Sequence, residues 1–386
     1  MLHTLAISGY RSLHDIALPM SPLTVITGEN GSGKSNLYKA LRLIVAAANG
    51  NLVSALAHEG GLPSTLWAGP ENISPAMKKG TVPIQGGPRK DRVRLKLGFS
   101  ADSYSYLIEL GMPVPVPYSA FNLDPAIKRE CLFVGDAWRQ ANVLVDRRGP
   151  LLKRREDRRW KTVTEHLPAY DSLFAQAGDP SSVPEVYALL QSIQSWRFYA
   201  DFRTDRDAPA RRTSPATRTP VLSADGHDLA AALQTIREVG DERALNDAID
   251  DAFPGSQLII ETIDDGKLEL TFKQPGLLRH LKLSEWSDGT LQYVMLVAAL
   301  LTPRPPPLLV LNEPEASLHP DLLPALARLI HNVSEQTQVW VITHANRLVN
   351  ALSTHDKTDA LHLVKEFGQT AVHGLGELDG PTWRWP

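Results

Sequence analysis

Cysteine is nearly absent from the 386-residue chain, in which Cys131 is the single example. One thiol cannot form an intramolecular disulfide, and no set of cysteines or histidines has the paired spacing of a zinc site. The absence of a disulfide framework favours a reducing compartment. Residues 1–13 contain Arg11 where a secretion signal would need an unbroken apolar stretch. We therefore expect a cytoplasmic protein.

Long apolar runs and a strong net charge are also lacking. The longest apolar run, 293–301, is far shorter than the roughly 20 residues that a membrane-spanning helix needs, so no membrane partner is expected. The formal net charge of -3 gives the whole chain no electrostatic attraction to nucleic acid, and any basic surface must be local. Sustained heptads and internal repeats are missing too, which argues against a long coiled-coil arm.

The hydrophobic pattern predicts an α/β protein. With 43% hydrophobic residues the chain can bury a large core, and its length suggests more than one lobe. In the last third, strand and helix patterns alternate, which indicates a parallel sheet covered by helices. Proline- and arginine-rich sequence at 113–220 lacks long periodicity, and 203–220 suggests a mobile loop. We expect an N-terminal part at 1–112, an inserted smaller lobe at 113–220 and a C-terminal part at 221–386.

The segment after the strand predicted at 23–27 has the spacing of a phosphate-binding loop. It reads Gly28-Glu29-Asn30-Gly31-Ser32-Gly33-Lys34-Ser35. Glycines let backbone N–H groups turn toward phosphate oxygens, and the helix predicted at 34–48 offers its positive N-terminal end. We expect ATP here, with Lys34 on the outer phosphates and Ser35 on Mg²⁺; a glycine turn that merely caps a helix is the alternative. The predicted nucleotide-binding residues are Asn30, Gly31, Ser32, Gly33, Lys34, Ser35 and Asn36.

Two polar residues end the apolar strand predicted at 308–311. In a doubly wound sheet such strand ends face the ligand crevice. Glu313 is the candidate general base that orients the attacking water, and Asn312 is the candidate magnesium-supporting residue. An amide oxygen carries one negative charge less than the usual aspartate, so we expect slow hydrolysis. The alternative is that both residues only cap the element that follows.

Two further segments lie where a bound nucleotide could be contacted. Ser287-Asp288-Gly289 precedes the helix predicted at 290–301, so Ser287 and the free N–H groups near Gly289 could face an anion. A simple helix cap is the local alternative. His344 follows the strand predicted at 339–343, where its imidazole could contact the terminal phosphate. The candidate catalytic residues are thus Lys34, Glu313 and His344.

Taken together, these segments resemble the RecF-like and structural-maintenance-of-chromosomes branch of the ABC ATPases, in its short form without a long arm or a TOPRIM domain. The resemblance rests on Ile7-Ser8-Gly9-Tyr10-Arg11-Ser12-Leu13, Ser287-Asp288-Gly289-Thr290-Leu291, Asn312-Glu313-Pro314-Glu315-Ala316-Ser317-Leu318-His319-Pro320 and Thr343-His344. It implies a P-loop NTPase fold with a mixed sheet, ATP and Mg²⁺ as ligands, and Arg11 near the nucleotide. It also implies an ATP-dependent homodimer in which Ser287 and Gly289 of one subunit cover the nucleotide of the other. Asn312 departs from the aspartate of the family.

A dense basic run is the candidate contact for DNA. Its cations could neutralise several phosphates, although acidic neighbours dilute them and a solvated face is the usual meaning of such a run. The residues are Arg147, Arg148, Lys153, Arg154, Arg155, Arg158 and Arg159.

Three functions remain open at this point. A DNA-associated ATPase in repair, genome maintenance or defence against foreign DNA fits the motifs best. Asn312 instead motivates a non-catalytic, ATP-dependent switch that recruits an effector protein such as a nuclease. A transporter's nucleotide-binding subunit fits the segments around Arg11 and Ser317 poorly.

Overall fold

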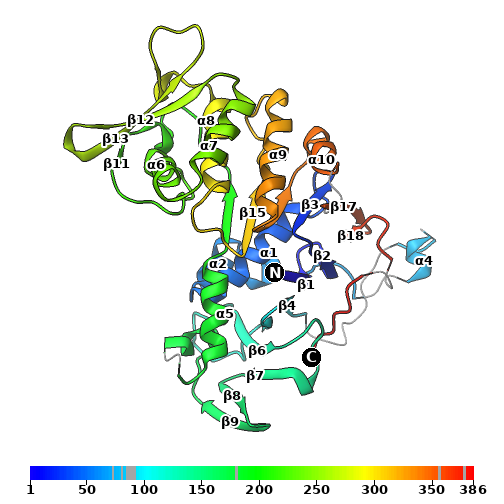
Figure 1. Ribbon diagram of the computed structural model, residues 1–386. Helices are drawn as coiled ribbons and strands as arrows, with labels where there is room; N and C mark the ends of the chain where they lie inside the picture. The colour runs from blue at the N-terminus through cyan, green and yellow to red at the C-terminus, as the bar shows by residue number, and fades with distance from the viewer. Residues whose placement is uncertain (72–73, 80, 84–92, 179–180, 355–357, 377–379) are drawn as a thin grey trace. The chain divides into compact units, whose positions relative to one another are not determined.

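The computed structural model describes residues 1–71, 74–79, 81–83, 93–178, 181–354, 358–376 and 380–386 (Figure 1). The chain folds into two compact units, both discontinuous in sequence. Unit 1 comprises Met1–Met20, Gly28–Trp196 and Leu361–Pro386, and unit 2 comprises Ser21–Thr27 and Arg197–Ala360. These limits differ from the divisions expected at 112 and 220, because the strands after residue 113 continue the sheet of unit 1.

An antiparallel sheet of eight strands forms the frame of unit 1, in the order β2-β1-β4-β5-β6-β7-β8-β9. Most residues of β1 and β4 are buried whichever face they point to, so these inner strands are covered on both sides. The strands are β1 (Leu2–Tyr10), β2 (Leu13–Pro19), β4 (Leu95–Ala101), β5 (Ser105–Gly111), β6 (Ala126–Phe133), β7 (Val143–Arg148), β8 (Leu151–Glu156) and β9 (Arg159–Thr164).

Helix α1 (Lys34–Ala48) is the longest helix described in unit 1 and begins directly after the glycine-rich loop. Its apolar residues recur every three or four positions, so Leu37, Leu41 and Ile44 are all buried on one side. The other helices of this unit are α2 (Leu52–His58), α3 (Leu62–Thr65), α4 (Pro75–Lys78) and α5 (Pro184–Gln194). A hairpin of β17 (Thr358–Glu366) and β18 (Gln369–Val372) completes it, with Leu363 opposite Val372.

Unit 2 contains four parallel strands in the order β10-β15-β16-β3. They are short apolar runs, as expected for strands buried on both faces: β10 (Arg197–Ala200), β15 (Leu308–Asn312), β16 (Gln338–Ile342) and β3 (Leu23–Gly28). The helices are α6 (Leu229–Val239), α7 (Glu242–Ala252), α8 (Asp288–Leu300), α9 (Leu323–Ser334) and α10 (Asn346–Leu352). A smaller antiparallel sheet holds β11 (Ser214–Pro215), β12 (Gln257–Ile263), β13 (Lys267–Lys273) and β14 (Leu281–Lys282).

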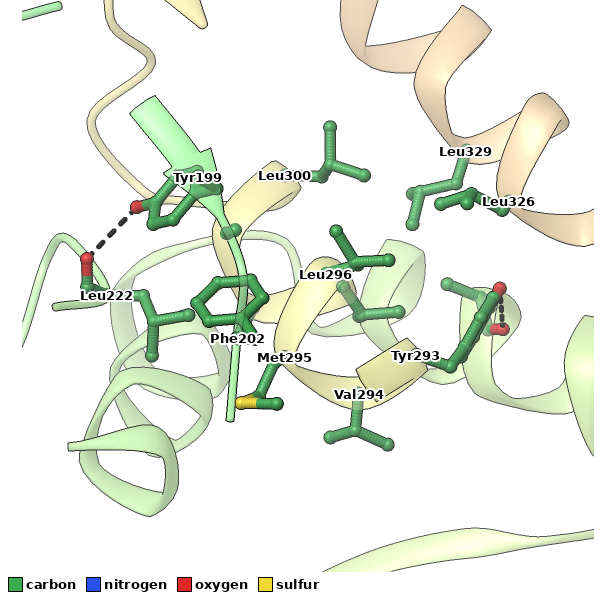
Figure 2. Packing of buried hydrophobic residues seen from close by; sticks show 14 of the residues in the cluster. Tyr199, Phe202, Leu222, Tyr293, Val294, Met295, Leu296, Leu300, Leu326 and Leu329 are labelled. Carbon is green, nitrogen blue, oxygen red and sulfur yellow. Dashed lines mark hydrogen bonds between the residues drawn. The ribbon is translucent and has the colours of Figure 1, made fainter. Parts of the chain in front are cut away.

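Helix α8 occupies the centre of the unit 2 core (Figure 2). All its residues from Leu291 to Leu300 are buried, which is typical of a helix surrounded by other elements. Two tyrosines of this core keep their hydroxyls hydrogen-bonded: Tyr199 donates to the carbonyl of Leu222 at 3.0 Å, and Tyr293 to that of Ala248 at 3.1 Å. The core therefore fixes α8, and with it the turn that precedes the helix.

Most of the segment 203–220, where a mobile loop is expected, is irregular. This segment contains β11 and a short 3-10 turn, and the Arg211 side chain ties it to the rest of unit 2. The guanidinium donates to the carbonyls of Thr204, Leu283 and Trp286 at 2.8, 2.6 and 3.0 Å, and to the carboxylate of Asp288 at 2.8 Å. One arginine thus satisfies several carbonyls that an irregular segment leaves without helix or sheet partners.

Candidate nucleotide-binding and catalytic residues

The glycine-rich loop of unit 1 has a backbone that only glycine fits well. Gly31 and Gly33 have φ angles of 81° and 113°, in the region that L side chains rarely adopt. A Cβ on Gly33 would also lie 2.1 Å from the hydroxyl oxygen of Thr370. The loop is therefore closely packed on β18 and turns sharply into α1.

Hydrogen bonds connect this loop and the start of α1 to β18 and to the β1–β2 turn. The Thr370 hydroxyl donates to the carbonyl of Ser32 at 2.7 Å and lies 2.7 Å from the hydroxyl of Ser12. Asn36 donates from its side-chain amide to Ser12 Oγ at 2.9 Å. Sequence reasoning misses Thr370 and includes Ser12 only as part of the family resemblance, because nothing in their local pattern indicates that β18 and the β1–β2 turn meet at the loop.

The loop suits a polyphosphate. Lys34 is only 6% exposed, and its ammonium donates to the carbonyls of Gly28 and Glu29 at 2.5 and 2.9 Å. Ser32 Oγ is buried and has no hydrogen-bond partner among the described residues, a costly arrangement unless a ligand satisfies it. The first turn of α1 has no side-chain cap, and a helix N-terminus is a typical site for an anion. Ser35 and Asn30 are exposed.

Arg11 is bound to a carboxylate of the same unit. Its guanidinium donates to Glu59 at 2.7 Å, and Tyr10 donates to the same carboxylate at 2.6 Å. Burial, together with Glu59, raises the pKa of the Tyr10 phenol, so this group stays a donor. The expected position of Arg11 near a nucleotide therefore remains a prediction. The residue of this turn that contacts α1 is Ser12, whose hydroxyl accepts a hydrogen bond from Asn36.

In unit 2, β15 ends in Asn312 and is followed by a sharp turn. Glu313 has a φ of 50°, unusual for a residue with a side chain, and its N–H donates to the carbonyl of Ile342 at 2.7 Å. This bond joins the ends of β15 and β16. The Glu313 side chain is 42% exposed, so its carboxylate is accessible.

Glu315 connects this turn to the residues that follow β16. Its carboxylate accepts hydrogen bonds from the Thr343 hydroxyl and, at 3.1 Å, from the N–H of His344. The His344 imidazole Nδ1 lies 3.4 Å from Glu315 and 3.7 Å from Glu313. The structure thus brings together the predicted Glu313 and His344. It adds Glu315, which is buried and which the sequence indicates only as part of the family resemblance.

Ser287 is the N-cap of α8. Its hydroxyl accepts a hydrogen bond from the N–H of Thr290 at 3.1 Å, so the local capping role that the sequence left open is present, and the residue is exposed. A Cβ on Gly289 would lie 2.9 Å from the carbonyl oxygen of Ser317, which itself has a φ of 63°. The turn before α8 and the loop after Glu315 are therefore in direct contact within unit 2.

The predicted site residues are divided between the two units. Arg11 and residues 30–36 belong to unit 1, whereas Ser287, Gly289, Asn312, Glu313 and His344 belong to unit 2.

One residue of the expected basic surface is not on the surface. Arg147 is fully buried on β7, where it pairs with Glu130 at 2.7 Å and donates to the carbonyls of Gly149 and Pro168. Its guanidinium therefore stabilises the interior of unit 1 and cannot contact DNA. Arg154 is part-buried and forms an ion pair with Glu185 at 3.2 Å. Arg148, Arg158 and Arg159 are exposed.

The mixed α/β architecture and the phosphate-binding loop define a P-loop ATPase domain. The family model described as "AAA domain, putative AbiEii toxin, Type IV TA system" matches residues 23–350. The chain belongs to that family.

Solved structures with the same fold include the SMC head bound to the C-winged helix domain of ScpA. It has a TM-score of 0.52 and 16% identity, with 96% of this chain and 97% of that chain covered. The SMC head domain from Thermotoga maritima has a TM-score of 0.47 and 19% identity, with the same coverage of 96% and 97%. At such identities the first likeness establishes the fold alone.

A curated relative shares a short segment. The OLD nuclease of Thermus scotoductus is 44% identical over 45 residues, which are 12% of this chain and 8% of that protein. The chain thus matches only a small part of that relative. Among the described residues no helix is long and apolar enough to cross a membrane.

Proposed function

We propose that this protein binds ATP with Mg²⁺ at the glycine-rich loop, hydrolyses it slowly, and forms a homodimer that closes around the nucleotide. The observation that carries the proposal is the loop itself. Gly31 and Gly33 hold the backbone in a phosphate-cradling shape, and the buried Ser32 hydroxyl beside them has no partner among the described residues.

The side chains of unit 1 would hold the nucleotide. Lys34 exchanges its two carbonyl partners for phosphate oxygens, a charge-assisted contact that is stronger than a neutral hydrogen bond. Ser35 is exposed at the start of α1, where its hydroxyl would bind Mg²⁺. When bound, Mg²⁺ would neutralise negative charge on the phosphates. Asn30 and Asn36 flank this position.

Glu313 is the proposed base. Its accessible carboxylate accepts a proton from the attacking water, and the left-handed backbone at this residue fixes its direction. His344, held beside it by Glu315, would donate to the terminal phosphate. Asn312 supports the metal with an amide oxygen in place of a carboxylate, which is the reason for expecting slow turnover.

Dimerisation completes the site in this proposal. Ser287 is exposed at the N-terminus of α8, and the contact of Gly289 with Ser317 joins that turn to the loop expected at the subunit interface. In a two-fold symmetric dimer each turn would cover the nucleotide of the partner subunit. We further infer a role in DNA repair, genome maintenance or anti-phage defence in the cytoplasm; the shared segment with an OLD nuclease supports this role.

The basic run of unit 1 remains the proposed DNA contact without Arg147. Arg148, Arg158 and Arg159 are exposed and carry this proposal, while Lys153, Arg154 and Arg155 are part-buried.

Nucleotide binding by wild type and Lys34→Ala, measured by calorimetry with ATP and Mg²⁺, tests the proposal. We expect Lys34→Ala to abolish binding, because phosphate charge then has no ammonium partner. The matched control is Lys39→Ala, an exposed lysine of the same helix, which should bind as wild type does. Equal ATP affinity of the Lys34→Ala and wild-type proteins would contradict the proposed site.

A non-catalytic switch is the second candidate, and Asn312 is the residue that favours it. In that case ATP binding and dimerisation would recruit an effector such as a nuclease without turnover. Light scattering of Glu313→Gln with ATP, together with its hydrolysis rate, separates the two. Slow turnover in wild type and a trapped dimer in Glu313→Gln support the ATPase. Turnover that is absent in both supports the switch.

A further inference from the structure

A pocket of about 610 Å³ opens within unit 1, and no residue of the glycine-rich loop lines it. This volume falls in the range of small-molecule sites. Its wall comes from one side of the eight-stranded sheet and from the segment around Trp67. None of the residues assigned above to ATP lines it.

Strand register places a row of charged side chains across the floor of this pocket. Lys96 of β4 is opposite Glu109 of β5, Glu109 is opposite Arg129 of β6, and Arg129 is opposite Arg148 of β7. Residues directly opposite each other in adjacent strands project to the same face of a sheet. The row is therefore a consequence of the pairing and crosses four strands.

Positive charge is in excess along this row. Five lysines and arginines line the pocket, against the two acidic side chains Glu71 and Glu109. Arg94 pairs with Glu109, and Asp146, which shares the face of β7 with Arg148, pairs with Arg129 at 3.2 Å. Asp146 also pairs with Arg148 at 3.1 Å, but Arg148 remains 62% exposed. An anionic ligand would offset this surplus.

Aromatic rings line the same pocket. Trp67 and His14 lie with ring centroids 5.3 Å apart and tilted by 57°. Burial lowers the pKa of His14, so at neutral pH this ring contributes flat surface and not charge. Lys96 lies 5.7 Å from the ring centroid of Trp385. Flat rings beside a cationic floor suit a ligand that has a planar base and a phosphate.

We propose that this pocket binds a nucleotide unit, with its phosphate on the Lys96–Arg148 row and its base beside Trp67. This nucleotide can be free or part of a single nucleic-acid strand, because both have a planar base and a phosphate. The site differs from the ATP site. It shares Arg148 with the basic run, but the other residues of that run do not line the pocket.

Fluorescence anisotropy with a labelled twelve-residue oligothymidylate tests the proposal. The variant is Lys96→Glu/Arg148→Glu, and Lys39→Glu/Arg42→Glu on α1 makes the same charge change outside the pocket. We expect the pocket variant to bind at least about tenfold more weakly and its salt slope to fall by about 1.4, since each lost phosphate contact on a single strand removes about 0.7. The control should bind like wild type. ATP binding by the pocket variant should be unchanged, which separates this site from the ATP site.

Competition with thymidine 5′-monophosphate shows whether the pocket binds a free nucleotide or a nucleic-acid strand. Displacement of the label by the monophosphate assigns the pocket to free nucleotides, whereas displacement only by unlabelled strand assigns it to nucleic acid. Wild type that binds neither probe would overturn the proposal. So would a pocket variant that binds as tightly as the α1 control. An effect confined to Arg158→Glu/Arg159→Glu would overturn it too and move the contact to the turn between β8 and β9.

Discussion

Glu315 accepts a hydrogen bond from the hydroxyl of Thr343, and the same carboxylate oxygen lies 3.4 Å from Nδ1 of His344. One buried side chain thereby links the turn after β15 to the turn after β16. The candidate base and the candidate phosphate-contacting histidine are held together by this link, so Glu315 is a positioning residue for both.

Replacing Glu315 with glutamine tests that link. Glu315→Gln keeps the size of the side chain but removes its charge. The new amide NH₂ group would either face the N–H groups that Glu315 accepts from or be buried without an acceptor. We expect unfolding free energy to fall by about 1–3 kcal/mol in urea denaturation. Glu313→Gln, at an exposed carboxylate, should change it by less than about 0.5 kcal/mol. Equal stability of both variants would contradict the role of Glu315.

Gly33 is the glycine of the loop with the least room for a side chain. Gly33→Ala would drive its Cβ into the Thr370 hydroxyl, so we expect the loop to shift and ATP affinity to fall by at least about tenfold, near 1.4 kcal/mol. Gly50→Ala is the control, because Gly50 also has a positive φ of 73° but meets nothing within 4 Å. That variant should lose only about 1–2 kcal/mol of stability. Calorimetric ATP affinity equal to wild type in Gly33→Ala would show that the close contact does not matter.

Arg147 and Arg148 are neighbours with opposite environments. Arg147→Ala leaves Glu130 buried without its cation, and we expect a loss of about 3–5 kcal/mol in unfolding free energy. Arg148→Ala removes an exposed cation and should stay within about 0.5 kcal/mol of wild type. Chemical denaturation of the two variants side by side measures the difference. A mild effect of Arg147→Ala would mean that the buried pair contributes little.

Asn312 sets the expected strength of the magnesium site. Asn312→Asp restores a carboxylate, the ligand that Mg²⁺ prefers, so turnover at limiting Mg²⁺ should be preserved or rise by up to about tenfold. The Mg²⁺ dependence of steady-state ATP hydrolysis is the measurement. Lower turnover in Asn312→Asp than in wild type at every Mg²⁺ concentration would be evidence against a metal-supporting role.

Local patterns predict the elements next to the proposed ATP site well. The helix expected at 34–48 is α1, and the strand expected at 308–311 is the start of β15. Both follow from contiguous signals, a glycine turn before a periodic helix and a short apolar run. The sheet order and the hydrogen bonds of Glu315 do not follow from such signals, because they depend on residues far apart in the chain.

Strands β6 to β9 show why the middle of the chain is harder to interpret. Their charged residues interrupt the expected alternation, as in the run Leu151–Glu156 of β8. Arg147 is buried only because Glu130 of the neighbouring strand meets it, a pairing that depends on register. The cation row from Lys96 to Arg148 arises from register in the same way, and no linear motif indicates it.

A mixing experiment tests the shared ATP site most directly. Lys34→Ala and Ser287→Arg are each expected to hydrolyse no ATP, since one lacks the phosphate contact and the other blocks the covering turn. In an equal mixture about half of the symmetric dimers pair the two variants, and each such dimer has one intact site, so about a quarter of wild-type turnover should return. A mixture as inactive as its parts would contradict a nucleotide site shared between two molecules.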